Sequence, residues 1–196
     1  MASDYTWITD PPIRHVAPEH VAEVVRRFRA SLASWGLVPG ATPLTQRINS
    51  HAHGASFIAD LIVAQLERHR PVFEYHLGGQ TVALLQLDLD GGVIEIKNLA
   101  THPGAEEAGG IMVEYALNRI AHYNAQGAEF DEGRLYLESY NADSTAAYEA
   151  LDFVVDSGDE MSLDANASGK WVKIHGAWKL ASKFAEGRTK YLSKDA

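Results

Sequence analysis

The clearest capacity for chemistry lies in residues 99–117, where a strand-like run is followed by a glycine-bearing turn and the start of a helix. Turns of this kind hold phosphate groups, because the unpaired backbone N–H groups of the first helical turn and the positive end of the helix dipole both face an anion. Gly109 and Gly110 permit the close approach of a ligand to the backbone. Where such a turn usually carries a cation, this one carries Glu106 and Glu107.

The two acids weaken a phosphate site without abolishing it. A carboxylate about 6 Å from a phosphate is repelled by roughly 0.7 kcal/mol in water and by roughly 3 kcal/mol at an effective dielectric constant of about 20. Glu106 and Glu107 also stabilise the first turn of their own helix in the absence of any ligand. The turn is therefore either a phosphate site that depends on backbone N–H groups or an ordinary helix start.

A second candidate is the strand 93–101, on which Glu95 and Lys97 share one face and apolar residues share the other. We expect this strand to be central in its sheet, where charged side chains are uncommon. A charged face on an inner strand indicates a cleft, which makes Glu95 a candidate for ligand binding or proton transfer. An ion pair between Glu95 and Lys97 on an exposed sheet face explains the same pattern.

Other chemistries are less well supported. The absence of cysteine excludes disulfides, thiolate nucleophiles and cysteine-ligated metal centres, and the sequence has no Gly-x-Ser-x-Gly motif that would expose a serine nucleophile. His51 and His53 have a spacing found in metal sites, but they fall in a predicted loop without a nearby acid. We therefore expect no metal.

The composition indicates one domain of ordinary size, because 46 % of the 196 residues are hydrophobic. Residues 1–15 contain acids and two prolines where a signal peptide needs a cationic start and an apolar run. No stretch approaches the ~20 apolar residues of a membrane span. We expect a cytoplasmic protein without a membrane partner.

The formal net charge of −9 argues against nucleic acid as the main partner and mildly favours amine ligands. Residues 177–196, in contrast, contain five lysines and arginines against two acids. Apolar residues recur at helical spacing in this segment, at Trp178, Leu180, Ala181, Phe184 and Ala185. We therefore predict a basic, helical C-terminal arm over residues 177–196 that packs on the domain, on a second copy in a homodimer, or on a partner.

Apolar periodicity and chain breakers predict the elements that position these residues. The predicted strands lie at 13–16, 72–77, 81–89, 93–101, 134–139 and 153–155 and within 170–175, and the predicted helices begin at Pro18, after Gly54, near Gly110 and near Asn141. A helix between strands 93–101 and 134–139 implies that these two strands run parallel, whereas their neighbours pair antiparallel. The predicted fold class is α/β (α+β), with a mixed, mostly antiparallel sheet flanked by helices.

Two stretches, GGVIEIKNLATHPGAEEAGGIMVEYAL and LYLESYNADSTAAYEALDFV, resemble the central and following segments of the GNAT superfamily of acyl-CoA-dependent N-acyltransferases. The residues that match the family pattern are Glu95, Leu99 and Pro103 in the first stretch and Asn141, Ser144, Tyr148 and Phe153 in the second. The second match is the more specific. The resemblance covers about half of the chain and implies a GNAT-like acyltransferase domain over residues 1–176.

The turn departs from the family pattern Gln/Arg-x-x-Gly-x-Gly/Ala. Glu106 takes the Gln/Arg position, Gly109 that of the first glycine and Ile111 that of the last small residue. A shifted alignment leaves the turn two residues short and does not restore the cation. Asp152 replaces the usual glycine before Phe153, although aspartate tolerates a left-handed backbone conformation better than most residues.

The resemblance implies transfer of an acyl group, most simply acetyl, from acetyl-CoA or another acyl-CoA to a primary amine of a small molecule, peptide or protein, by direct attack in a ternary complex. It also implies a catalytic base at Glu95 and, at Tyr148, a phenol that donates a proton to the departing thiolate. The cofactor-binding residues that it implies are Leu99, Ala100, Thr101, Gly109, Gly110, Ile111 and Asn141.

Several of these residues have a structural alternative. Tyr148 also suits a core aromatic position, and Asn141 is a good N-cap for the helix that it begins. The departures in the turn leave open a non-catalytic binding or interaction module of the same fold. The segments 37–53 and 156–169 are predicted to be loops that flank the acceptor pocket.

Overall fold

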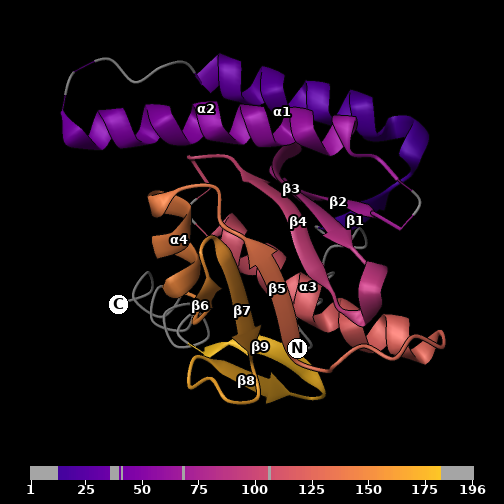
Figure 1. Cartoon of the computed structure of the whole chain (residues 1–196). Helices are drawn as coiled ribbons and strands as arrows, with labels where there is room; N and C mark the ends of the chain where they lie inside the picture. The colour runs from indigo at the N-terminus through magenta and orange to yellow at the C-terminus, as the bar shows by residue number, and fades with distance from the viewer. Residues whose placement is uncertain (1–12, 36–39, 41, 68, 106, 182–196) are drawn as a thin grey trace, which may run out of the picture. The chain divides into compact units, whose positions relative to one another are not determined.

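The computed structural model describes residues 13–35, 40, 42–67, 69–105 and 107–181. The strands are β1 (Ile13–Val16), β2 (Val72–Leu77), β3 (Gln80–Asp88), β4 (Glu95–Thr101), β5 (Arg134–Glu138), β6 (Val154–Ser157), β7 (Glu160–Asp164), β8 (Trp171–Ile174) and β9 (Ala177–Leu180). The helices are α1 (Val21–Trp35), α2 (Pro43–Ala64), α3 (Ala108–Ala125) and α4 (Ala142–Glu149), with short 3-10 turns at Pro18–His20 and Asp90–Gly92 (Figure 1).

Within the described residues, seven strands form one sheet in the order β1-β2-β3-β4-β5-β7-β6, and β8 and β9 form a separate hairpin. β4 and β5 run parallel, with Glu95 opposite Tyr136 and Ile96 opposite Leu137. The pairs β1–β2, β2–β3, β5–β7 and β6–β7 are antiparallel. The predicted fold class and the predicted parallel pair are therefore confirmed.

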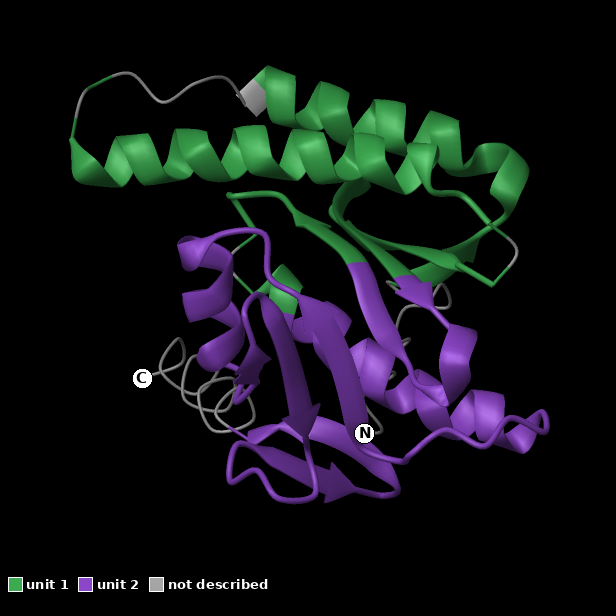
Figure 2. Ribbon diagram, viewed as in Figure 1, with its two compact units in different colours: residues 1–86, 98–109 green, residues 87–97, 110–196 purple. Residues whose placement is uncertain are grey.

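The chain divides into two compact units, one of residues 1–86 and 98–109 and the other of residues 87–97 and 110–196 (Figure 2). In the first unit, β2 and β3 are joined at Gly78 and Gly79, whose φ angles are 60° and 82°. Two consecutive positive φ angles give the turn whose twist matches that of the flanking strands, and glycine adopts them without strain. The two predicted strands 72–77 and 81–89 are thus joined as a tight hairpin.

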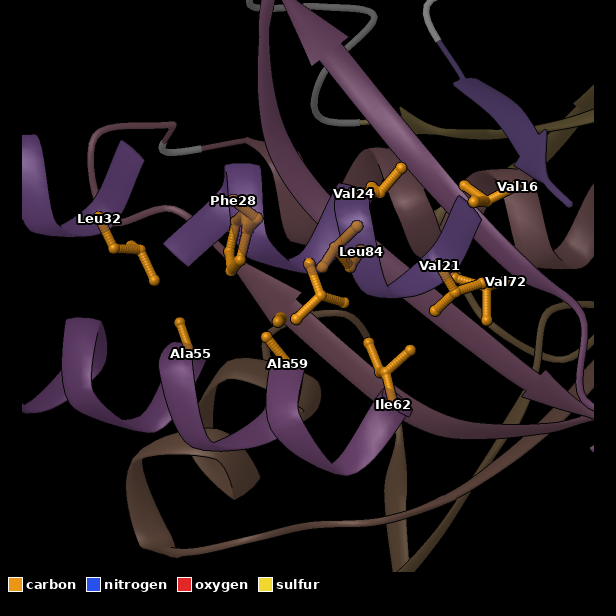
Figure 3. Close-up of a cluster of buried hydrophobic side chains, with 12 residues drawn as sticks. Val16, Val21, Val24, Phe28, Leu32, Ala55, Ala59, Ile62, Val72 and Leu84 are labelled. Carbon is orange, nitrogen blue, oxygen red and sulfur yellow. The ribbon is translucent and has the colours of Figure 1, made fainter. Parts of the chain in front are cut away.

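The core of the first unit lies between its two helices and its strands (Figure 3). The buried face of α1 consists of Val21, Val24, Val25, Phe28 and Leu32. From α2, the small side chains of Ala55 and Ala59 point toward this face, together with Ile62. Phe28, Ala59 and Ile62 are fully buried. The inward side of α1 follows the helical spacing of its apolar residues, whereas Phe57, expected on the apolar face of α2, is 46 % exposed.

Helix α2 begins at Pro43, so the prediction of a helix that starts only after Gly54 was wrong. Pro43 occupies the first turn, and the Oγ1 of the N-cap Thr42 accepts a hydrogen bond from the Thr45 N–H at 3.2 Å. Gly54 lies inside the helix, and a Cβ added there would meet nothing within 4 Å. A Thr-Pro start outweighs one solvent-facing glycine, which costs a helix only about 1 kcal/mol. The predicted loop 37–53 is therefore helical from residue 43.

In the second unit, α3 buries apolar residues at helical spacing, namely Met112, Val113, Ala116, Leu117 and Ile120. The polar stripe of α3 contacts β9. Asn118 donates to the Trp178 carbonyl at 3.0 Å and accepts from the Trp178 N–H at 2.7 Å, and Lys179 Nζ lies 2.6 Å from Glu114 Oε1. Polar side chains of α3 therefore contact a strand that was not predicted from the sequence.

Two predictions near the C-terminus differ from the structure. Strand β7 lies inside the segment 156–169 that was predicted as a loop, with Met161 and Leu163 buried. Residues 177–180 form β9 instead of the start of a helix, because buried Trp178 and Leu180 alternate with more exposed neighbours. Residues 182–196 lie outside the described residues, and the helical arm there stays a prediction. Among the described helices, none is long and apolar enough to cross a membrane.

Candidate active site

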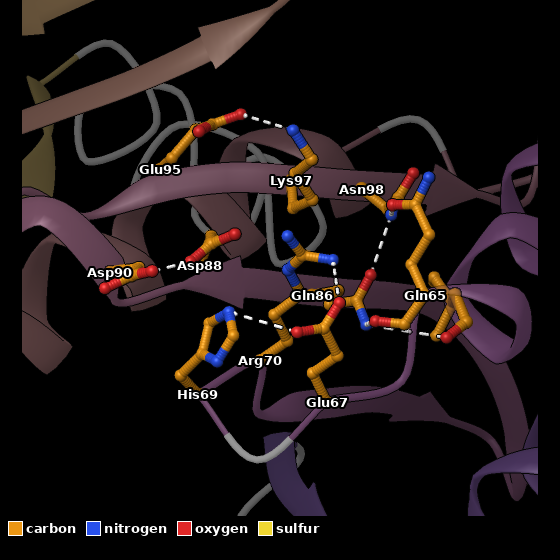
Figure 4. Close-up of polar contacts among 11 residues, drawn as sticks. Gln65, Glu67, His69, Arg70, Gln86, Asp88, Asp90, Glu95, Lys97 and Asn98 are labelled. Atoms are coloured by element: carbon orange, nitrogen blue, oxygen red, sulfur yellow. Dashed lines mark hydrogen bonds and ion pairs between the residues drawn. The ribbon is translucent and has the colours of Figure 1, made fainter.

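Strand β4 has two faces of different character. Glu95, Lys97, Leu99 and Thr101 are partly exposed, whereas the side chains between them are buried. Glu95 Oε1 lies 3.2 Å from Lys97 Nζ, and the two side chains are 28 % and 26 % exposed (Figure 4). The predicted ion pair is therefore present. Because Glu95 keeps access to solvent, the ion pair leaves its carboxylate available to a ligand.

The buried face of β4 carries an amide network (Figure 4). The Nδ2 of Asn98 donates to Gln86 Oε1 at 2.7 Å and to Gln65 Oε1 at 3.2 Å. The Nε2 of Gln86 donates to the backbone carbonyls of Gln65 and Ile62, at the end of α2. Buried amides are costly unless they are paired, so this network ties the end of α2 to β3 and β4. In the sequence, the signal for this network is that Gln86 and Asn98 stand at strand positions whose inward-facing neighbours are apolar.

The turn after β4 uses much of its own hydrogen-bonding capacity. The His102 N–H donates to the Val82 carbonyl at 2.8 Å, and the Nδ1 of His102 accepts from the Gly104 N–H at 3.0 Å. The His102 carbonyl accepts from the Ala105 N–H at 2.9 Å, and the Ala105 carbonyl accepts from the Ala108 N–H at 3.0 Å. These bonds fix the shape of the turn without a ligand.

The N–H groups left for a ligand are those at the start of α3. Gly109 and Gly110 lie in the first turn of a helix that begins at Ala108, where the N–H groups have no acceptor within the helix. The N–H of Ile111, one residue further, is the first in this helix to have an acceptor four residues earlier. A Cβ added at Gly109 would meet Thr101 Cγ2 at 3.8 Å, an ordinary contact. The residues present thus fit a phosphate held by backbone N–H groups. Glu106 lies outside the described residues.

The negative charge of Glu107 affects a tyrosine of the same unit, Tyr75. Burial raises the pKa of Tyr75 on β2, and the negative charge of exposed Glu107 raises it further. Tyr75 therefore stays a neutral phenol at physiological pH. Glu107 places negative charge close to the turn, as expected from the sequence.

His51 belongs to α2 and not to the predicted loop. Its Nε2 lies 3.0 Å from both the carbonyl oxygen and the Oγ1 of Thr101. Because a carbonyl oxygen only accepts, Nε2 must carry the hydrogen in this arrangement. His53, two residues further along the helix, projects from a different face. Among the described residues, no three of His, Asp and Glu come together as metal ligands would.

His102 is the second histidine of the turn, and it is only 8 % exposed. Burial lowers its pKa below the ordinary value of 6.5, and the charge of His51 lowers it further, whereas a hydrogen bond with the Ser31 backbone raises it. The neutral ring is thus favoured. Its contacts join the turn to α1 and β3, which spacing in the sequence could not reveal.

The start of α4 confirms the predicted N-cap. Asn141 Oδ1 accepts from the Ser144 N–H at 2.9 Å, and Ser144 Oγ accepts from the Asn141 N–H at 2.9 Å. This capping box satisfies two backbone donors reciprocally. A direct role of Asn141 in cofactor binding stays a prediction.

Tyr148 lies on α4 and is partly exposed. Its ring makes an edge contact with Phe153, with centroids 5.4 Å apart. Burial raises the pKa of Tyr148 to about 12. The phenol is therefore protonated at neutral pH, which is the state that a proton donor needs.

Asp152 adopts the left-handed conformation expected at this position, with φ of 69°. Its carboxylate contacts Lys170 Nζ at 2.8 Å and Ser168 Oγ at 2.5 Å. Both hydrogen bonds lower the pKa of Asp152, and the one with Lys170 has the larger effect. Side-chain contacts from the β8 region therefore support a backbone conformation that glycine would adopt on its own.

Taken together, the strand order, the parallel pair of β4 and β5 and the turn that leads from β4 into α3 agree with the architecture that the sequence resemblance implied. No family model and no curated protein matches the chain.

Comparison with solved structures finds acetyltransferases to which this chain is similar. The PaiA N-acetyltransferase of Thermoplasma acidophilum, in complex with coenzyme A, is 12 % identical over 77 % of this chain and 95 % of its own, with a TM-score of 0.43. A GNAT acetyltransferase of Brucella melitensis, in complex with acetyl-CoA, is 14 % identical over 78 % and 86 %, with a TM-score of 0.42. The AtaT–AtaR complex with bound DNA is 11 % identical over 76 % and 91 %, with a TM-score of 0.44.

At this level of similarity, these GNAT structures carry no argument about activity or substrate. The agreement with a GNAT-like architecture depends on the topology described above. The expected exclusion of nucleic acid as a partner stays a prediction.

Proposed function

We propose that this GNAT-fold chain transfers an acyl group, most simply acetyl, from acyl-CoA to a primary amine. The observation that carries the proposal is the start of α3, where the N–H groups of Gly109 and Gly110 have no acceptor within the helix. Leu99, Ala100 and Thr101 of β4 would offer backbone groups to the pantetheine arm, as the family resemblance implies.

Glu95 and Tyr148 have the proposed catalytic roles. An amine must be neutral to attack a thioester, and Glu95, which carries an ionisable carboxylate with solvent access, would take up the proton of the acceptor ammonium. The protonated phenol of Tyr148 would donate a proton to the departing thiolate. Attack would be direct, because the chain has no cysteine for a covalent intermediate.

The test is calorimetric binding of acetyl-CoA to the full chain and to two variants at Gly109. Gly109→Ala adds a methyl group in ordinary contact with Thr101, so it should fold and bind within a few-fold of the wild type. Gly109→Glu suits the helix start but adds a negative charge where the phosphates would lie. We expect it to weaken binding by about 100-fold, from repulsion of roughly 3 kcal/mol.

Binding that both variants leave unchanged would contradict the proposed site. The absence of any binding of acetyl-CoA, free CoA or longer acyl-CoAs to the wild type would contradict the function. Thermal unfolding of the three proteins provides the folding control, since neither substitution places a side chain at a positive φ angle.

A second candidate function is a non-catalytic GNAT-fold module. It is favoured by the ion pair of Glu95 with Lys97 and by the hydrogen bonds within the described part of the turn, which form without a ligand. A module of this kind would show no acyl transfer to any amine. The acceptor amine, the cytoplasmic location and a homodimer stay predictions.

A further inference from the structure

We propose that His102 positions the turn after β4 and that acyl-CoA binding weakens when the His102 ring takes up a proton. This inference rests on the proposed function. It assigns to His102 the role of a positioning residue, because the ring acts on the ligand through the backbone of the turn.

Three hydrogen bonds place His102 at the centre of the turn. Its N–H holds the end of β4 to the Val82 carbonyl, its carbonyl accepts from Ala105, and its ring Nδ1 accepts from the Gly104 N–H at 3.0 Å. The ring bond closes the turn over two residues. Without it, Gly104 and its neighbours lose the contact that fixes the path of the chain toward α3.

The bond between the ring and Gly104 exists in one protonation state only. A neutral imidazole can accept at Nδ1 while Nε2 carries the hydrogen. In the protonated ring both nitrogens donate, so Nδ1–H and the Gly104 N–H would face each other. Protonation therefore replaces an attraction by a repulsion at the turn.

The groups around the ring set the pH range of this change. Burial and the charge of His51 on α2 favour the neutral ring, and the Ser31 backbone of α1 opposes them. β3 contributes the backbone of Val82, an uncharged group. Within the turn, Glu107 is exposed, and its charge acts on Tyr75 of β2. The His102 pKa is lowered from 6.5. The hydrogen bond between the Gly104 N–H and the ring is therefore present at neutral pH, and it is lost as the pH falls through the lowered pKa.

Two amide variants separate the acceptor from the titration. The first is His102→Asn, whose Oδ1 can replace Nδ1 as the acceptor for the Gly104 N–H. The second is His102→Gln, whose longer side chain carries its amide to the position of Nε2 and leaves the Gly104 N–H without this acceptor. Neither amide takes up a proton, and both fill the buried position with a polar side chain of similar type.

The first measurement is the Kd of acetyl-CoA at pH 7.5 and pH 5.5. At pH 7.5 we expect His102→Asn to bind within a few-fold of the wild type and His102→Gln to bind about ten-fold more weakly, as for one lost hydrogen bond. Between the two pH values the wild type should lose about ten-fold relative to His102→Asn. The comparison is made at each pH because phosphates titrate near pH 6.

The second measurement uses the ligand-free protein. The amide resonance of Gly104 should titrate with a midpoint below 6.5 in the wild type and should not titrate in His102→Asn. In His51→Gln, which removes a charge that lowers the His102 pKa, the midpoint should rise.

The two measurements distinguish failure of the inference from failure of the proposed function. If no form of the protein binds acyl-CoA but Gly104 titrates as described, the function fails and the positioning role of His102 in the turn stands. If His102→Gln binds as tightly as the wild type, or if the pH dependence of binding is the same in His102→Asn, the inference is overturned and the function stands.

Discussion

Two regions of the molecule carry the GNAT resemblance, and they differ in how they accommodate their departures from the family pattern. In the region 141–153, Asp152 takes the place of a glycine, and Lys170 and Ser168 hold its carboxylate. In the region 95–111, acids stand where a cation is usual, and the sequence offers no lysine or arginine between residues 98 and 111 to replace it. The turn is held instead by its own backbone and by His102.

The difference separates two kinds of departure. A residue that is required for a backbone conformation can be replaced when neighbouring side chains stabilise that conformation, and the folded chain alone shows the replacement. A residue that is required for a ligand has no such partner within the fold. Its loss is therefore judged by binding and by rates, whereas a conformational replacement is judged by stability.

The largest effect is expected for Tyr148→Phe. Loss of a positioned proton donor should lower kcat by about 100-fold, a typical contribution of general acid catalysis. The ring contact with Phe153 is kept in this variant, so the melting temperature and the Kd of acetyl-CoA should stay close to those of the wild type. A full rate in Tyr148→Phe would exclude Tyr148 as the donor.

A smaller, pH-dependent effect is expected for Glu95→Gln. Steady-state rates with an amine substrate should fall by about 30-fold near pH 7, and the deficit should shrink above about pH 9 as the amine loses its proton without help. The matched control is Lys97→Gln, which removes the ion pair but keeps the carboxylate. If both variants lose the same rate at every pH, the pair is structural and Glu95 is not the base.

Substitutions of Asp152 should act on stability alone. We expect Asp152→Ala to lower the free energy of unfolding by about 2 kcal/mol, because alanine is strained at positive φ and both side-chain contacts are lost. Asp152→Gly should lose less, since glycine adopts this conformation freely. Urea unfolding measures both. If both variants lose the same free energy of unfolding, the side-chain contacts of Asp152 account for the loss, and the strain of alanine at positive φ does not.

The pH dependence of the Asp152 contribution has a definite sign. Its pKa is lowered in the folded chain, so the carboxylate stabilises the fold above the ordinary pKa of aspartate, and the stabilisation is lost as the pH falls through the lowered value. The difference in free energy of unfolding between the wild type and Asp152→Gly should therefore become smaller at acidic pH.

The smallest effect is expected at the N-cap of α4. Asn141→Ala should cost about 1 kcal/mol of unfolding free energy, whereas Asn141→Ser keeps a capping oxygen and should cost little. Serine cannot reproduce the amide group, so acetyl-CoA binding by Asn141→Ser reports any contact of the cofactor with that amide. An unchanged Kd would assign Asn141 to the cap alone.

The fold was largely predictable because its signals are local. The Gly78-Gly79 hairpin, the apolar faces of α1 and α3 and the parallel pair of β4 and β5 all follow from spacing along the chain. The start of α2 was missed because polar residues before Gly54 conceal its apolar face. β7 was missed because the Asp, Ser and Gly residues around it indicate a loop. β9 was missed because Trp178 and Leu180 also fit the helical spacing of the apolar residues that follow them.

The site was predictable only in part. The pairing of Glu95 with Lys97, the cap at Asn141 and the conformation of Asp152 depend on residues close in sequence or on backbone preference. The contacts of His51 with Thr101 and of His102 with Val82 join residues that only the tertiary fold brings together. No periodicity or motif marks them.

The amide network on the buried face of β4 has a consequence for strand alignment. Asn98 and Gln86 bond to each other across two strands. A slip of β4 by one residue would turn Lys97 or Leu99 inward and leave several amides unpaired, which costs far more than a slip in an apolar strand. The network therefore selects one register of β4. It thereby determines which residue ends β4 and which residue begins the turn toward α3.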